Sequence, residues 1–121
     1  MSALSGQFEG AATSGELPVE LGTDYVVVAG PLDMQAYNTV SFYAQNVGAT
    51  EISSIVVESA PAESGPWVEY ADLASGGALE GDTSAFYGGI SGQAFKWIRL
   101  RAKVAAGSTT ARFWVCVGGV R

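Results

Sequence analysis

The sequence predicts an all-β fold, an antiparallel β-sandwich of the jelly-roll or immunoglobulin-like type with about seven or eight strands and a flexible N-terminal arm. Short apolar segments alternate with clusters of turn residues, which is the spacing of strands in a sandwich or barrel. Sixteen glycines and four prolines occur in 121 residues, and both residue types disfavour helices. No long segment has apolar residues at helical spacing, so we expect no helix beyond a turn near residues 32–36.

The chain divides into an N-terminal arm, residues 1–20, and a β-sandwich domain, residues 21–121. The arm is rich in Ser, Gly and Ala and has no strand or helix periodicity. Such a segment buries too little apolar surface to offset the entropy of ordering it. We therefore expect the arm to be flexible in isolation and to become ordered on a neighbouring subunit, where its apolar side chains would make protein contacts: Leu4, Phe8 and Leu17.

Three strands are expected in the first half of the sandwich domain. Residues 25–29 form a β-branched apolar run that a Gly-Pro dipeptide closes, which fits a strand buried on both faces. Residues 39–47 alternate between apolar and polar side chains, as a half-buried strand does. Residues 51–59 change phase near Ser53, and a β-bulge at that point accounts for the change.

The second half begins with a loop and a short strand and ends in a predicted hairpin. Residues 67–71 form the short strand after the loop at 60–66, and residues 72–93 are a long loop with a brief strand at 84–87. The hairpin joins residues 95–103 to residues 109–117. With the aliphatic face of each hairpin strand in the core, the outward face carries two tryptophans and four cations: Trp97, Arg99, Arg101, Lys103, Arg112 and Trp114.

Charge is distributed unevenly along the chain, whose net charge is −6. All 12 acidic residues lie between Glu9 and Asp82, and all six basic residues lie between Lys96 and Arg121. Two interpretations stay open: the basic strands neutralise acidic strands beside them, or a basic stripe and an acidic body meet complementary neighbours in an assembly. An acidic surface repels phosphates, so we expect no nucleic acid partner.

The N-terminus and the apolar segments give no sign of export or of a membrane span. The first residues lack the basic start and apolar core of a secretory signal, so Sec-type export is not expected. No apolar run approaches the roughly 18 to 20 residues that cross a bilayer, and we expect no membrane partner.

The residue types present do not favour catalysis, so we predict that the protein is not an enzyme. The chain contains no histidine, which is the commonest general base and metal ligand. Its single cysteine, Cys116, is mid-strand with no partner base and is interpreted as a packing residue. We predict no catalytic, cofactor-binding or metal-binding residue, although the carboxylates of Glu80 and Asp82 leave calcium binding open.

The outward aromatic side chains of the second half have three interpretations. They could anchor another protein, together with the neighbouring arginines. They could form a platform for sugars, built from Trp97, Trp114 and Tyr70. A second sheet could also cover them, in which case they are packing residues. The candidates for protein interaction in this half are Trp67, Trp97, Arg99, Arg101, Arg112 and Trp114.

Three segments carry a resemblance to a known class of protein. Residues 32–48, LDMQAYNTVSFYAQNVG, are followed by VVES at 56–59 with Trp67-Val68 after the next turn, and by FKWIRLRA at 95–102. The pattern over residues 32–117 resembles small β-sandwich virion proteins of tailed bacteriophages. It departs from them at residues 59–66, where relatives often have a compact Ser-Pro-Asp-Gly-type turn.

The resemblance implies a head decoration (cement) protein on the capsid exterior of a virion, made in the host cytoplasm. Such a protein binds the lattice of the major capsid protein and stabilises it by bridging subunits. The resemblance also implies a homo-oligomer, with a trimer favoured, and no cofactor. Two alternatives remain: a tail or baseplate accessory protein of the virion, and a carbohydrate-binding β-sandwich module.

Overall fold

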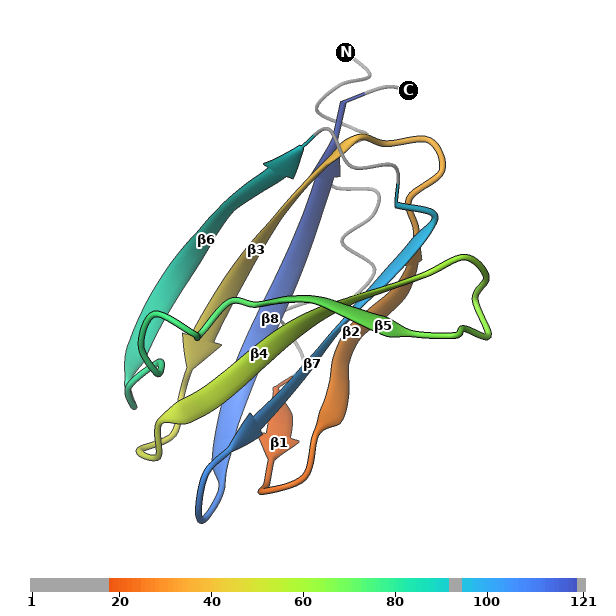
Figure 1. Ribbon diagram of the computed structural model, residues 1–121. Helices are drawn as coiled ribbons and strands as arrows, with labels where there is room; N and C mark the ends of the chain where they lie inside the picture. Colours follow the sequence, from red (N-terminus) through yellow and green to blue (C-terminus); the bar gives the residue numbers. More distant parts are fainter. Residues whose placement is uncertain (1–17, 92–94, 120–121) are drawn as a thin grey trace.

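The computed structural model describes residues 18–91 and 95–119 (Figure 1). These residues contain eight strands and no helix. The strands are β1 (Val19–Leu21), β2 (Val26–Asp33), β3 (Thr39–Asn46), β4 (Ile52–Ala60), β5 (Val68–Asp72), β6 (Thr83–Ser91), β7 (Trp97–Val104) and β8 (Thr109–Gly118). Leu4, Phe8 and Leu17 lie outside the described residues, whereas β1 begins inside the segment expected to be the arm.

The strands form two four-stranded antiparallel sheets that pack face to face. Sheet A has the order β1-β8-β3-β6, and sheet B has the order β2-β7-β4-β5. Strand β1 pairs with β8, β2 with β7, β3 with β6 and β4 with β5. A long hairpin that is rolled up gives this pattern, which defines the eight-stranded jelly roll. The predicted antiparallel β-sandwich is therefore confirmed, and strand pairing selects the jelly-roll alternative over the immunoglobulin-like one.

The core lies between the sheets because the central strands alternate strictly. In β3, β7 and β8 every second side chain is buried, as the side-chain period of a strand requires. The largest buried side chains from the two sheets include Phe42 and Phe113 of sheet A and Ile98 and Leu100 of sheet B, all at about 1% exposure. The predicted inward faces of β3, β7 and β8 are thus correct.

The predicted C-terminal hairpin is wrong. Strand β7 pairs with β2 and β4 in sheet B, whereas β8 pairs with β1 and β3 in sheet A. Residues 105–108 therefore carry the chain from one sheet to the other. Alternation shows which side chains face the core, but a short turn can connect two strands of one sheet or of two stacked sheets. As a consequence, the outward faces of β7 and β8 lie on opposite sides of the molecule.

Strand β2 is longer and more exposed than predicted. It continues through Gly30 and Pro31 instead of ending there. Its register with β7 shifts twice, between Val27 and Leu32, and an edge strand with such irregularities can hold a proline. Val26 and Val27 are 36% and 45% exposed, because β2 is the edge of sheet B and is not buried on both faces.

Strand β6 also exceeds the brief strand predicted at residues 84–87. It spans nine residues and pairs with β3 along its length. A register shift opposite Ser41 accommodates the glycines 88 and 89, whose presence in the sequence suggested a loop. The predicted irregularity in β4 is confirmed, because its register with β7 shifts between Ile52 and Ser54.

One buried polar side chain connects three loops at one end of the sandwich. Asn46 is fully buried at the end of β3. Its Nδ2 donates to the carbonyl oxygens of Thr50 and Leu79, at 2.7 and 3.0 Å. Its Oδ1 accepts a hydrogen bond of 2.7 Å from the hydroxyl of Thr109. The β3–β4 turn, the β5–β6 loop and the start of β8 are therefore held together by one amide.

Candidate functional site

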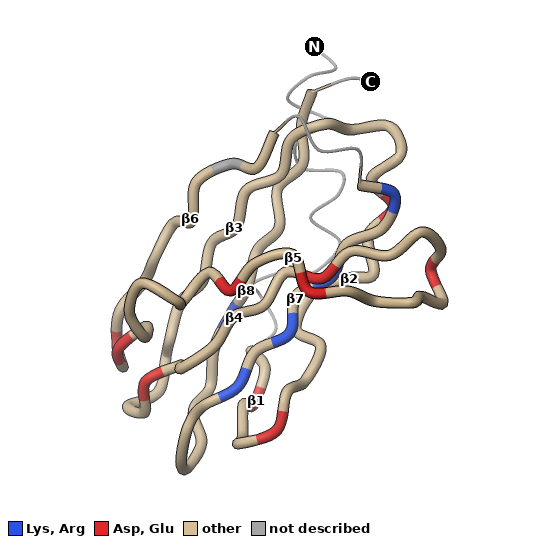
Figure 2. The backbone as a smooth tube through the Cα atoms, in the orientation of Figure 1, with Lys and Arg blue, Asp and Glu red and all other residues tan. Residues whose placement is uncertain are grey.

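The outer face of sheet B carries most of the charged side chains of the central strands. Glu58 of β4 lies opposite Arg99 of β7 and is only 8% exposed. Its Oε1 accepts a hydrogen bond of 2.6 Å from Arg99 Nε and lies 3.7 Å from Arg101 Nε. Basic β7 runs beside acidic positions on β4 and β5 (Figure 2). Here the interpretation that the basic strands neutralise their acidic neighbours is correct.

The same cations also lie over aromatic rings of sheet B. The Arg99 guanidinium lies 4.4 Å from the centre of the Trp67 ring. Arg101 and the Lys103 ammonium lie 4.6 and 4.7 Å from the ring of Tyr25. Cation–π contacts of this kind are favourable within about 6 Å. Of the residues that the sequence suggested as protein contacts, Arg99 therefore packs on Trp67 and Arg101 on Tyr25 within the same domain.

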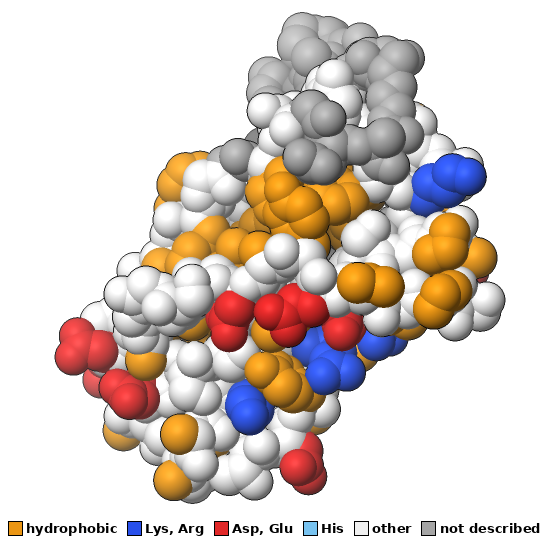
Figure 3. Space-filling view, viewed as in Figure 1, with side chains coloured by type: hydrophobic (Ala, Val, Ile, Leu, Met, Phe, Trp, Pro, Cys, Tyr) orange, Lys and Arg blue, Asp and Glu red, His pale blue; other side chains and the backbone are white. Residues whose placement is uncertain are grey.

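The ion pairs and cation–π contacts hold charged and aromatic side chains flat over the outer face of sheet B. Val56 points to this face, opposite Arg101, and is nevertheless only 3% exposed. Acidic and basic side chains lie next to each other across the middle of this side (Figure 3). Arg99 is paired with Glu58, and the β7 cations lie over aromatic rings, so we do not place the functional site here.

The outer face of sheet A carries a row of three aromatic side chains. Tyr43 of β3 is the register partner of Trp114 on β8 and of Phe86 on β6. The Tyr43 and Phe86 rings are 4.8 Å apart between centroids. Tyr43 is 45% and Phe86 57% exposed, and Trp114 is partly buried. Phe86 was not among the residues predicted from the sequence, although its alternation with Ala85 and Tyr87 places it on the outward face of a strand.

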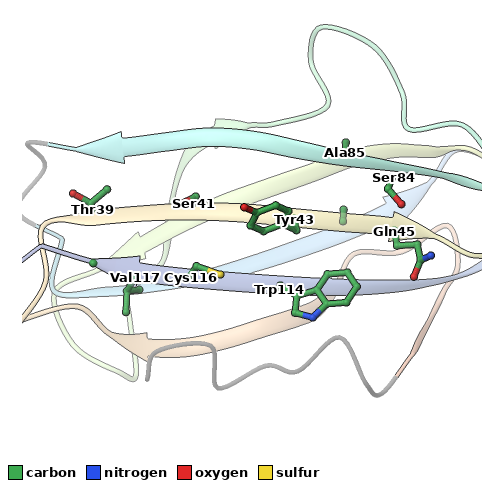
Figure 4. Close-up of a pocket in the computed structure, with 11 residues that line it drawn as sticks. Thr39, Ser41, Tyr43, Gln45, Ser84, Ala85, Trp114, Cys116 and Val117 are labelled. Carbon is green, nitrogen blue, oxygen red and sulfur yellow. The ribbon is translucent and has the colours of Figure 1, made fainter. Parts of the chain in front are cut away.

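A groove on this face follows β3 and passes between Tyr43 and Trp114, with a volume of about 620 Å³. Its walls come from β3, β6 and β8 (Figure 4). The aromatic lining comes from Tyr43 and Trp114, and none of the lining residues within 18–91 and 95–119 is charged. The polar lining consists of hydroxyl and amide groups, from Thr39, Ser41, Gln45 and Ser84.

The cysteine in this groove is not an activated nucleophile. Cys116 lines the groove beside Trp114. Burial raises the pKa of its thiol above the ordinary value, so the thiol stays protonated at neutral pH. Because the thiolate is the reactive form, this position does not support cysteine chemistry.

The sugar platform predicted from Trp97, Trp114 and Tyr70 does not form. Trp97 lies on β7 in sheet B, between Asp33 and Ala60, and Trp114 lies on the opposite side of the sandwich. Tyr70 packs edge-on against Phe95, with 5.1 Å between ring centroids. The cause is the change of sheet between β7 and β8, which also separates the β8 cation, Arg112, from the arginines of β7.

The four edge strands differ in how far they are protected from pairing with another chain. Strand β1 has three residues, β5 has five and includes Glu69 and Asp72, and β2 contains Pro31 and two register shifts. Short length, charge, proline and irregular register all hinder pairing at an edge. Strand β6 has nine residues without charge or proline, so the regular stretch at 83–87 is the least protected edge.

The described part of the chain gives no metal-binding cluster and no membrane helix. Among residues 18–91 and 95–119, no three side chains of the types His, Cys, Asp and Glu gather as metal ligands do. The calcium site considered at Glu80 and Asp82 therefore gains no support from these residues. Within the same ranges, no helix has the length and apolar character needed to cross a membrane.

Comparison with known proteins identifies the fold but not a family. No protein-family model matches the chain, and no curated protein matches it in sequence. The structure is similar to the PBSX exported protein XepA, with a TM-score of 0.67 and 12% identity over 87% of this chain. The chain spans 36% of the length of XepA.

Two further structures resemble the chain. PirA is 15% identical with a TM-score of 0.56, over 84% of this chain and 91% of PirA. A structure of Bacillus endospore appendages, which are disulfide-linked pili, is 10% identical with a TM-score of 0.49, over 84% of this chain and 81% of the other. At such identities the likeness concerns the fold alone.

Proposed function

We propose that this chain is a non-catalytic structural protein of a phage-type particle. More specifically, we propose a decoration protein that binds the lattice of the major capsid protein and stabilises it by bridging neighbouring subunits. The observation that carries this proposal is the β6 edge, which is long, uncharged and free of proline. The jelly-roll likeness to a phage exported protein supports the same class of protein.

The β6 edge is suited to joining two protein surfaces. A strand at a sheet edge presents free backbone donors and acceptors, and an extended segment of a partner can pair with them as an added strand. Phe86 belongs to this strand, and its side chain is 57% exposed. An exposed aromatic side chain beside an open edge supplies the apolar anchor that interface hot spots use. We assign the lattice contact to residues 83–87.

A decoration role also agrees with the rest of the molecule. Glu58 pairs with Arg99 and Arg101 on the outer face of sheet B, and one hydrophobic core joins the two sheets, so the domain can act as a rigid body. On a lattice, many weak contacts act together and give strong overall attachment. The homo-oligomer that we expect, a trimer, would multiply the β6 contacts in the same way.

Co-sedimentation with empty heads of the matching major capsid protein tests this proposal. Wild-type protein should sediment with the heads, and Phe86→Lys should weaken this association about tenfold or more, because a lysine at an edge strand opposes pairing. The matched control is Val68→Lys, which changes an exposed residue of the β5 edge, 63% exposed, in the other sheet.

One result would reject the decoration role, and another would reject the β6 edge as its contact. Wild-type protein that does not sediment with heads but does sediment with tails would support the tail or baseplate alternative. If Phe86→Lys and Val68→Lys weaken the association with heads equally, the β6 edge is not the contact. Light scattering on the purified chain gives the oligomeric state in the same series.

A further inference from the structure

The groove on the outer face of sheet A combines two kinds of side chain in an ordered way. The rings of Tyr43 and Trp114 lie in the middle of the groove, Gln45 and Ser84 lie at one end, and Thr39 and Ser41 lie at the other (Figure 4). Tyr43 and Trp114 are directly opposite each other on neighbouring strands, so their positions are set by the sheet and not by a loop.

The chemistry of this lining suits a ligand that is polar but uncharged. A hydroxyl group both donates and accepts hydrogen bonds, and a carboxamide offers two donors and an acceptor. Ser41, Ser84, Thr39 and Gln45 therefore match a ligand that itself carries many hydroxyls. Aromatic rings pack against the apolar C–H face of a pyranose ring, as amphipathic aromatic surfaces do elsewhere. Among the described residues that line the groove none is charged, and Arg112, the register partner of Gln45, is the cation beside this end of the groove.

The size and shape of the groove favour an oligosaccharide over a single sugar. Its volume of about 620 Å³ falls within the range of roughly 300 to 1,000 Å³ that is usual for small-molecule sites. The lining follows β3 from Thr39 to Gln45, a distance of about 20 Å at the usual rise of a strand. A site of this length can contact several sugar units in a row.

From this geometry we propose that the outer face of sheet A binds a neutral glycan, stacked on Tyr43 and Trp114 and hydrogen-bonded by Gln45 and Ser84. This is a second binding activity beyond the proposed attachment to a capsid lattice. The two proposed contacts overlap at β6, where Ser84 and Ala85 line the groove and also belong to residues 83–87. The other glycan contacts, Tyr43, Gln45 and Trp114, lie on β3 and β8, which are inner strands of sheet A. One protein can therefore attach to a particle by its edge and present a sugar-binding face.

Calorimetric titration with defined oligosaccharides tests the proposal. The probes are hexasaccharides of glucose, mannose and N-acetylglucosamine, with a hexasaccharide of galacturonic acid as the anionic comparison. At least one neutral probe should bind, and the anionic probe should bind more weakly or not at all. Trp114→Ala and Gln45→Ala should each weaken the binding about tenfold. The matched control, Trp97→Ala, changes a partly buried tryptophan of the other sheet and should leave the affinity unchanged.

Alkylation of Cys116 gives a second measurement at the site itself. This residue is the only cysteine of the chain and lines the groove, so a bound glycan should slow its reaction with iodoacetamide. The readout needs no change to the aromatic residues, and it therefore does not depend on whether Trp114→Ala folds. Thermal unfolding shows which variants keep the wild-type fold.

The outcomes separate this proposal from the attachment role. Gln45→Ala should lose glycan binding and keep the association with heads, because Gln45 lies on the inner strand β3 and not on the β6 edge. Failure of all neutral probes to bind or to protect Cys116 would overturn the glycan proposal and leave the edge proposal intact. Loss of head binding in Trp114→Ala, together with no glycan binding, would instead make the groove a protein contact.

Discussion

Replacing Asn46 by alanine should lower the free energy of unfolding by about 3 kcal/mol, or roughly 1 kcal/mol for each of three hydrogen bonds. The buried hydroxyl of Thr109 loses its acceptor, and the carbonyls of Thr50 and Leu79 lose a donor. The carbonyl of Leu79 still accepts from the backbone N–H of Ile52, so the loss at that position is the smallest. In a domain of this size the melting temperature should fall by about 10 °C.

Urea denaturation followed by circular dichroism measures the change directly. The matched control is Asn38→Ala, because Asn38 is exposed and surface substitutions usually change stability by about 0.5 kcal/mol or less. A loss below about 1 kcal/mol for Asn46→Ala, or one equal to the control, would refute the view that this amide holds three loops together.

A second substitution at the same position tests the donor alone. Asn46→Asp keeps an oxygen for the hydroxyl of Thr109 but turns the other oxygen toward two carbonyls. Only the protonated carboxyl can donate to them, so this variant should be more stable at acid pH than at neutral pH relative to wild type. No pH dependence of the difference would contradict the assigned orientation of the amide.

Three further substitutions have expected outcomes. Glu58→Gln removes the counter-charge of two partly exposed β7 arginines and should cost about 1 kcal/mol in urea denaturation, with a smaller loss at high salt. Burial, and secondarily the charge of Asp72, raise the pKa of Tyr87 above its ordinary value of 10.0. The unfolded chain therefore releases this proton first, and stability should fall as the pH rises through the alkaline range; Tyr87→Phe should flatten that decline. Gly81→Ala places a Cβ 2.5 Å from a backbone oxygen and should cost about 1 to 3 kcal/mol, whereas Gly76→Ala meets nothing within 4 Å and should unfold at nearly the wild-type urea concentration.

Features that depend on neighbouring residues could be predicted well. Alternation along β3 correctly placed Phe42 in the core, and the same reasoning placed Leu100 and Phe113. The change of phase in β4 correctly indicated a bulge next to Ile52. These successes have one cause: the side chains of a strand point to opposite faces in turn, so a local pattern reports which face is buried.

Features that depend on distant residues were predicted less well. Glycines 88 and 89 suggested a loop, but pairing with β3 keeps them within β6. Pro31 suggested the end of a strand, but its position at the edge of sheet B lets β2 continue. In both places the pairing partner, which a single segment does not reveal, overrides the local preference.

The sequence alone is sufficient for the β-sandwich class and for the inward faces of β3, β7 and β8. It is not sufficient for the location of the candidate site. Whether Trp97 and Trp114 share a face depends on which strands pair, and β7 and β8 pair with strands far away along the chain. Strand pairing is a non-local choice made by packing the whole core, so only the tertiary structure placed Trp114 beside Tyr43 and β6 at the edge of sheet A.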